Sequence, residues 1–221
     1  MNLKRIIWRQ WLKLRFHLFQ KHRFNRLTLE YVEKRPFLIL PEVFNPTLFL
    51  TSDFMVQAFN EQLIPPESSV LDMGTGSGIG AVFAAQWAKC VVAVDVNPEA
   101  VRCARINVLL NEVDSTVDVR ESDLFSAVSE QFDVILFNPP YFPGKPTSML
   151  DRAFHADDVI ERFAAELSDH LVENGRLLLL LSSDAPEDDI LALFHDQGFS
   201  NDIAAQQNLK CETITLFQLA Q

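Results

Sequence analysis

The sequence predicts an α/β fold, a doubly wound and mostly parallel sheet with helices on both faces. Beyond residue 66, short apolar runs alternate with segments of helical periodicity, and this alternation produces right-handed βαβ units. Four of the seven glycines directly follow the first of these runs, where doubly wound sheets bind their ligands. Three runs are continuously apolar, as strands buried on both faces are: residues 91–94, 134–136 and 177–181.

The elements follow one another in a regular order after Pro65-Pro66, where we place the boundary of the main domain. Asn97-Pro98 indicates a helix start, because proline suits the first helical position. Strands are expected over residues 69–73, 90–95, 115–120, 132–137, 175–181 and 211–218. Helices are expected over residues 78–88, 98–111, 157–172 and 187–197. We expect three parts in all. Residues 1–35 form a basic helical extension, residues 36–66 a linker or lid over the ligand pocket, and residues 67–221 the main domain.

The first 35 residues form a basic extension. They contain ten Lys and Arg against two acids, whereas the rest of the chain contains nine against twenty-eight. Residues 3–24 have the pattern of an amphipathic helix, with a stripe made of Ile7, Trp11, Leu14 and Leu18. Four interpretations of this helix stay open: packing on the domain, attachment to a membrane surface, docking on RNA or a partner protein, and an organelle targeting peptide.

Composition excludes several classes of protein. With 221 residues, 48% of them hydrophobic, the chain can bury a core and form one domain with an appendage. No apolar run approaches the roughly 18–20 residues of a membrane-spanning helix. The three cysteines are far apart and form no C-x-x-C pair, so we expect a cytoplasmic protein, with peripheral attachment at a membrane left open. The acidic main domain disfavours a broad nucleic-acid-binding face.

The glycine cluster reads Asp72-Met-Gly74-Thr75-Gly76-Ser-Gly78 and carries the strongest functional signal. Glycine permits positive φ angles and lets the backbone approach a ligand closely. Gly76, Gly78 and Ala81 also match the fingerprint of a dinucleotide-binding loop. Such a loop binds phosphates, and a phosphate does not need the acid at Asp72. The aminium and sulfonium of S-adenosylmethionine (SAM) do benefit from a nearby anion. We therefore predict a SAM site that contains Asp72, Gly74, Thr75, Gly76 and Gly78.

Two more acids follow the next two predicted strands. Asp95 ends the strand at residues 90–95, where a carboxylate can accept both ribose hydroxyls, with Val96 beside it. Its alternative role is a charge at the helix N-terminus. Asp123 follows the third strand, where it can accept from an adenine amino group while Leu124 or Phe125 packs against the ring. Acids at three successive strand ends indicate one shared nucleoside site.

The fourth predicted strand ends at Asn138-Pro139-Pro140-Tyr141. The prolines fix φ and remove backbone donors, so the carbonyl groups of this corner remain available as acceptors. The amide oxygen of Asn138 and the carbonyl of Pro139 can take both hydrogens of a planar NH2 group, while Tyr141 supplies a ring to stack on it. These four residues are the predicted catalytic residues, with Asn138 also beside the cofactor; the alternative is a turn stiffened by proline.

With these motifs the chain resembles the class I SAM-dependent methyltransferases, and among them the amino methyltransferases with an N-P-P-Y motif, such as release-factor glutamine methyltransferases. The resemblance covers about residues 36–220 and rests on D-x-G-x-G-x-G from Asp72 and N-P-P-Y from Asn138. It implies a Rossmann-like sheet of seven strands with an antiparallel last strand, and a planar nitrogen as methyl acceptor. It also implies that the segment from Pro41 to Ser52, which contains Thr51, helps to close the cofactor pocket.

We therefore predict transfer of a methyl group from SAM to an amide or exocyclic amine, with no metal. The acceptor stays open between a protein glutamine, a small or lipophilic amine and a base of RNA or DNA. The loop over residues 144–158, with Lys145, Arg152 and His155, is expected to border it. The rival functions are an NAD-dependent oxidoreductase, a catalytically idle SAM-binding subunit, and a membrane-localised methyltransferase suggested by the Phe-rich segment 37–59.

Overall fold

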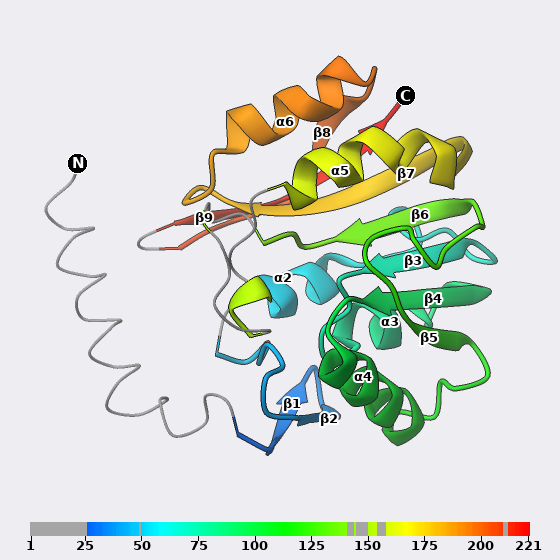
Figure 1. Ribbon diagram of the computed structural model, residues 1–221, viewed down its shortest axis with the longest axis vertical. Helices are drawn as coiled ribbons and strands as arrows, with labels where there is room; N and C mark the ends of the chain where they lie inside the picture. Colours follow the sequence, from blue (N-terminus) through cyan, green and yellow to red (C-terminus); the bar gives the residue numbers. More distant parts are fainter. Residues whose placement is uncertain (1–25, 49, 141–143, 145–149, 154–157, 210–211) are drawn as a thin grey trace, which may run out of the picture.

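A seven-stranded sheet forms the centre of the molecule (Figure 1). The computed structural model describes residues 26–48, 50–140, 144, 150–153, 158–209 and 212–221. The strands are β3 (Ser69–Met73), β4 (Cys90–Asp95), β5 (Val117–Glu121), β6 (Phe132–Phe137), β7 (Leu171–Ser182), β8 (Ser200–Asn208) and β9 (Thr213–Ala220), in the order β5-β4-β3-β6-β7-β9-β8. Neighbours are parallel, except that β9 runs antiparallel to β7 and β8. The predicted fold class is confirmed.

Helices cover both faces of the sheet, with α5 and α6 on one face and α2, α3 and α4 on the other (Figure 1). Phe163 of α5 and Leu71 of β3 belong to one buried cluster, whereas Val82 of α3 and Val70 belong to a second. Since Val70 and Leu71 are adjacent, β3 is buried on both faces, as its apolar sequence predicts. The helices are α2 (Leu50–Ala58), α3 (Ile79–Ala84), α4 (Pro98–Leu110), α5 (Val159–Glu166) and α6 (Glu187–Asp196), with 3-10 turns at Asp151–Ala153 and Leu167–His170.

The predicted elements of the main domain are present, although some bounds differ. The helix predicted over residues 78–88 ends at Ala84, and the last turn of the helix predicted over residues 157–172 is a 3-10 helix. The sequence pattern does not predict β8, because this edge strand is polar and mostly exposed. The pattern of apolar residues therefore predicts the buried strands and misses the exposed one.

A hairpin that precedes the sheet is also not predicted. It consists of β1 (Thr28–Val32) and β2 (Arg35–Ile39), with the two turn residues Glu33 and Lys34 at φ 46° and 69°. Turns of this kind favour Asn and Gly, so Glu-Lys carries no recognisable signal. The hairpin spans residue 35, at which the division between extension and lid is predicted. That division and the one at residue 66 stay predictions.

Helix α4 anchors the hairpin to the glycine loop through Asn107, which is fully buried. The Asn107 amide oxygen accepts from the Leu38 amide at 2.7 Å, and its nitrogen donates to the Leu38 carbonyl at 2.9 Å. The same nitrogen donates to the carbonyl of Ser77 in the glycine loop at 2.8 Å. One amide side chain thus holds two chain segments that lie far apart in sequence.

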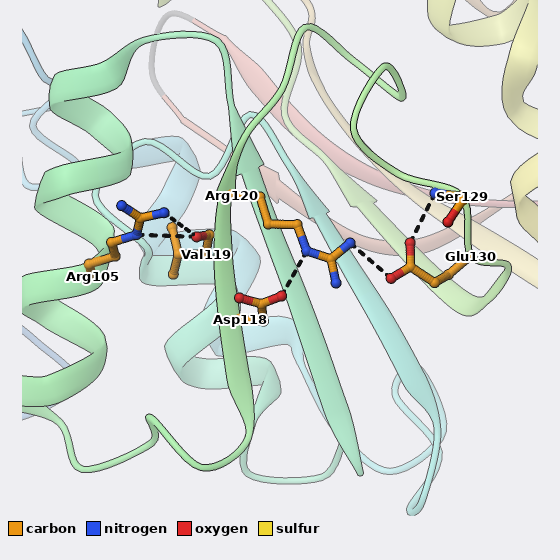
Figure 2. Close-up of polar contacts among 6 residues, drawn as sticks. All are labelled: Arg105, Asp118, Val119, Arg120, Ser129 and Glu130. Atoms are coloured by element: carbon orange, nitrogen blue, oxygen red, sulfur yellow. Dashed lines mark hydrogen bonds and ion pairs between the residues drawn. The ribbon is translucent and has the colours of Figure 1, made fainter.

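Two arginine side chains bind polar groups at the edge strand β5 (Figure 2). Arg105 of α4 donates to the Val119 carbonyl through Nε (3.2 Å) and Nη2 (2.9 Å). Arg120 pairs with Asp118 at 2.7 Å and with Glu130 at 2.8 Å. An edge carbonyl that is already bonded is a poor acceptor for another strand, so Arg105 disfavours strand addition at this site.

The Phe-rich segment contributes to the core. Phe37 is completely buried and Phe59 is 5% exposed, so these two rings do not form a membrane-binding surface. Within the described ranges, no helix combines the length and the apolar character needed to cross a membrane. The helix predicted over residues 3–24 lies outside the described residues.

Candidate active site

The predicted site residues follow four adjacent strands at one edge of the sheet. Met73 of β3 pairs with Val94 of β4 on one side and with Phe137 of β6 on the other. The next residues along these strands, Gly74, Asp95 and Asn138, therefore emerge side by side. β5 joins the same edge, because the Ser122 amide donates to the Asp95 carbonyl at 2.9 Å. The structure thus brings the four predicted motifs together.

The glycines of the loop differ in their surroundings. Gly74 (φ 68°) and Gly76 (φ 56°) have left-handed backbones, and a Cβ at either position would meet no atom within 4 Å. Gly78 also has a positive φ, but a Cβ there would lie 3.1 Å from Cα and Cβ of Ala104 in α4. Gly74 and Gly76 therefore leave open space for a ligand, whereas Gly78 permits close packing of the loop on α4.

Asp72 is a buried acid whose hydrogen bonds are made inside the loop. One carboxylate oxygen accepts from the Thr75 hydroxyl at 2.5 Å and from the Ala81 amide at 2.8 Å. Burial raises the pKa of Asp72 to about 6, against the lowering effect of these two hydrogen bonds. These contacts give Asp72 a role in positioning the loop and the start of α3. Its direct contact with a cofactor cation stays a prediction.

Gly80→Ala is expected to lower the free energy of unfolding by about 1–3 kcal/mol, the usual cost of overpacking a core. A Cβ at Gly80 would lie 2.7 Å from Oδ1 of Asp72 and 2.9 Å from its Cγ, so the carboxylate would have to leave its partners. Urea unfolding measures the change. The matched control is the same substitution in an Asp72→Ser background, where the colliding atoms are gone and the cost should largely disappear. Equal costs in both backgrounds would contradict this account.

Asp95 connects the end of β4 to the glycine loop. Its Oδ2 accepts from the Gly76 amide at 2.9 Å, and its Oδ1 accepts from the Asn97 amide at 2.9 Å. Burial raises the pKa of this carboxyl, while the backbone donors act in the opposite direction. The residue keeps some exposed surface, as does Val96 after it. Asp95 is therefore positioned by the loop and still accessible to a ligand.

Asn97 has a role that the sequence pattern does not reveal. Its amide oxygen caps α4 by accepting from the Glu99 amide at 3.0 Å. Its nitrogen donates to the carbonyl of Glu42 at 2.8 Å, and so places the segment after the hairpin beside the end of β4. Asn97-Pro98 indicates the helix start, but no local signal indicates a partner 55 residues away.

Thr51, which is expected to contact the cofactor, lies buried in the first turn of α2.

Asp123 lies in a compact turn after β5. The Ser122 hydroxyl donates to the Leu124 carbonyl at 2.6 Å and accepts from the Ala127 amide at 2.9 Å, which holds Leu124 at a left-handed φ of 50°. The Leu124 side chain is buried, whereas the Asp123 carboxylate is half exposed and pairs with Arg162 at 3.0 Å. This Oδ2–Nη2 pair leaves Oδ1 of Asp123 available as an acceptor.

The corner after β6 is described up to Pro140. Asn138 and Pro140 are partly exposed and Pro139 is buried. Tyr141 lies outside the described residues, as do Lys145 and His155, and the side chain of Arg152 is not described. The roles predicted for these four side chains stay predictions. The position of Asn138 next to the glycine loop follows from the strand register alone.

The chain matches the family model described as methyltransferase small domain over residues 35–208. It is 33% identical over 183 residues to a Methanocaldococcus jannaschii protein named as a protein N5-glutamine methyltransferase, with 79% of this chain and 89% of that protein covered. It is 34% identical to a ribosomal protein L11 methyltransferase of Heliobacterium modesticaldum (77% and 50% covered). It is also 34% identical to a release factor glutamine methyltransferase of Koribacter versatilis (66% and 57% covered). The chain thus spans about half the length of the last two relatives.

Among solved structures, a Thermus thermophilus 16S rRNA N2 G1207 methyltransferase in complex with AdoMet and guanosine has the same fold. The TM-score is 0.65 at 21% sequence identity, and the match covers 87% of this chain and 49% of that one. This likeness concerns the arrangement of the sheet and its helices.

Proposed function

The chain belongs to the methyltransferase small domain family and is a SAM-dependent N-methyltransferase, and from this premise we propose that its acceptor is the side-chain amide nitrogen of a protein glutamine. The observation that carries the proposal is the register of β3 and β6, in which Phe137 pairs with Met73. This register puts Asn138 next to Gly74 along the end of the sheet, and it supports our proposal that Asn138 and the following Pro139 hold the acceptor close to the cofactor.

The residues of the site fit SAM. The open side of Gly74 and Gly76 leaves space for the ligand, and the carboxylates of Asp95 and Asp123 lie at adjacent strand ends for the ribose and the adenine. When bound, SAM supplies a methyl group made electrophilic by its sulfonium. Val96, Leu124 and Thr51 are the further cofactor contacts that we propose.

The chain's own residues act on the acceptor by orientation. The amide oxygen of Asn138 and the carbonyl of Pro139 accept the two N–H groups of a planar amide, which aims its nitrogen at the cofactor. Tyr141 stacks on the plane of the amide. Proline at positions 139 and 140 keeps the corner in one conformation, so these acceptors need little rearrangement.

Two observations favour a protein glutamine over the other acceptors. The chain covers 89% of a relative that is named for protein N5-glutamine methylation. Outside the first 35 residues the chain carries twenty-eight acids against nine Lys and Arg, and such a surface repels the phosphates of RNA. Free Cys90 and Cys103 agree with action in the cytoplasm, which we propose as the location.

The proposal is tested with SAM labelled in its methyl group. The enzyme is incubated with host lysate separated into protein, RNA and small-molecule fractions, and then with a purified release factor. We expect label in protein, and mass spectrometry should place one methyl group on a glutamine. The matched substrate control replaces that glutamine by asparagine and should take up none. Label confined to RNA or to small molecules would overturn the glutamine proposal.

A further inference from the structure

One face of the β1–β2 hairpin exposes a row of apolar side chains. Leu27, Leu29 and Tyr31 occupy alternate positions and are 60%, 54% and 65% exposed, whereas Glu30, between Leu29 and Tyr31, and Val32, after Tyr31, are buried. On β2, Leu38 pairs with Leu29 and Pro36 pairs with Tyr31, so these residues lie on the same side of the hairpin; both are half-buried, and Leu38 also packs against the core. We call these five residues the hairpin apolar face.

Such a face requires an explanation. The described residues contain six exposed large hydrophobic side chains, and three of them lie at alternate positions in this strand and directly before it. Isolated exposed hydrophobic residues, such as Ile203 on β8, are ordinary, but a contiguous apolar row indicates a surface that is covered by something.

We propose that the chain's own residues 3–24 cover the hairpin apolar face with the stripe formed by Ile7, Trp11, Leu14 and Leu18. This segment ends at residue 24, and only two residues separate it from Leu27, where the exposed row begins. As a helix it would be about 33 Å long, whereas a five-residue strand is about 17 Å long, so part of the stripe suffices to cover the face. The short connection around residue 25 is sufficient for a chain reversal.

Charge around the hairpin fits the same occupant. Glu33 at the hairpin turn and Asp53 on α2 both accept from the Gln57 amide, at 2.9 and 3.1 Å. Burial and the nearby Glu33 raise the pKa of Asp53, so two carboxylates lie close together beside the hairpin turn. Residues 1–24 contain seven Lys and Arg and no acid, so they bring the complementary charge.

The tryptophans of the chain provide the test, because Trp8 and Trp11 lie in the segment and Trp87 is the third. In the full chain with Trp87→Phe, we expect a blue-shifted emission and weaker acrylamide quenching than in the isolated peptide 1–25. Leu29→Gln together with Tyr31→Gln should return both values toward those of the peptide. Ile203→Gln, which changes an equally exposed residue at the other end of the sheet, should leave them unchanged.

Four outcomes would overturn the proposal. The first is an emission of the intact chain equal to that of the peptide. The second is a blue-shifted emission that does not change with the hairpin substitutions. The shift can depend on protein concentration with a doubled sedimenting mass, which would assign the face to a second copy. It can also occur only with vesicles of anionic phospholipid, which would assign the segment to a membrane surface. Far-UV circular dichroism of each variant shows that the domain remains folded.

Discussion

Asn138→Ala is expected to lower turnover by about 10²–10³-fold, the loss typical of removing one preorganised polar group from an active site. The affinity for SAM should stay within a few-fold, because the Asn138 amide is proposed to bind the acceptor, whereas the carboxylates proposed to bind the ribose and the adenine follow β4 and β5. The physical reason is that one of the two acceptors that orient the nucleophilic nitrogen is lost. Turnover at saturating SAM and calorimetric binding of S-adenosylhomocysteine measure the two quantities separately.

Substitutions at Tyr141 are the matched controls for this prediction. Tyr141→Phe retains a ring that can stack on the acceptor and should have a mild effect, whereas Tyr141→Ala should mainly raise the KM for the acceptor. An Asn138→Ala enzyme that turns over normally would mean that the corner is only a stiff turn. The corner would then not hold an amide acceptor, whereas the proposed cofactor site would be unaffected.

The sequence predicts the parts of this fold that are buried on both sides. β3, β4 and β6 are found at the predicted residues because continuous apolar runs follow from a sheet covered by helices on both faces. β8 and the β1–β2 hairpin escape prediction for the opposite reason. An edge strand needs few apolar residues, and a Glu33-Lys34 turn lacks the residues that favour positive φ.

The sequence predicts which residues lie at the strand ends that form the candidate site. It does not predict the side-chain hydrogen bonds that hold those residues in place. The carboxyl ends of parallel strands meet at one edge, so Gly74, Asp95 and Asn138 could be grouped from the order of elements. The contact of Asn97 with Glu42 and that of Asn107 with Leu38 join residues separated by 55 and 69 positions. Such contacts depend on the packed structure, because they leave no periodic or local pattern in the sequence.

Asp95→Ala is expected to weaken binding of SAM by about 10–150-fold, which corresponds to the roughly 1.5–3 kcal/mol of hydrogen bonds to a charged group. The structure gives this loss two sources. The carboxylate accepts from the Gly76 amide and so helps to shape the glycine loop, and it is also the predicted acceptor for the ribose hydroxyls. Calorimetry with S-adenosylhomocysteine measures the total loss in a variant whose folding is verified by its unfolding transition.

A ligand lacking both ribose hydroxyls separates the two sources. The carboxylate of Asp95 accepts backbone N–H groups from Gly76 at Oδ2 and from Asn97 at Oδ1, and the Val96 N–H also stabilises its charge; a carboxylate offers about four lone-pair sites, so a hydroxyl can still bind. The parent enzyme should therefore prefer S-adenosylhomocysteine to its 2′,3′-dideoxy analogue, and Asp95→Ala should bind the two almost equally. If the substitution weakened both ligands by the same factor, Asp95 would act only through the loop. The ribose contact would then have to be sought elsewhere along the ends of β4 and β5.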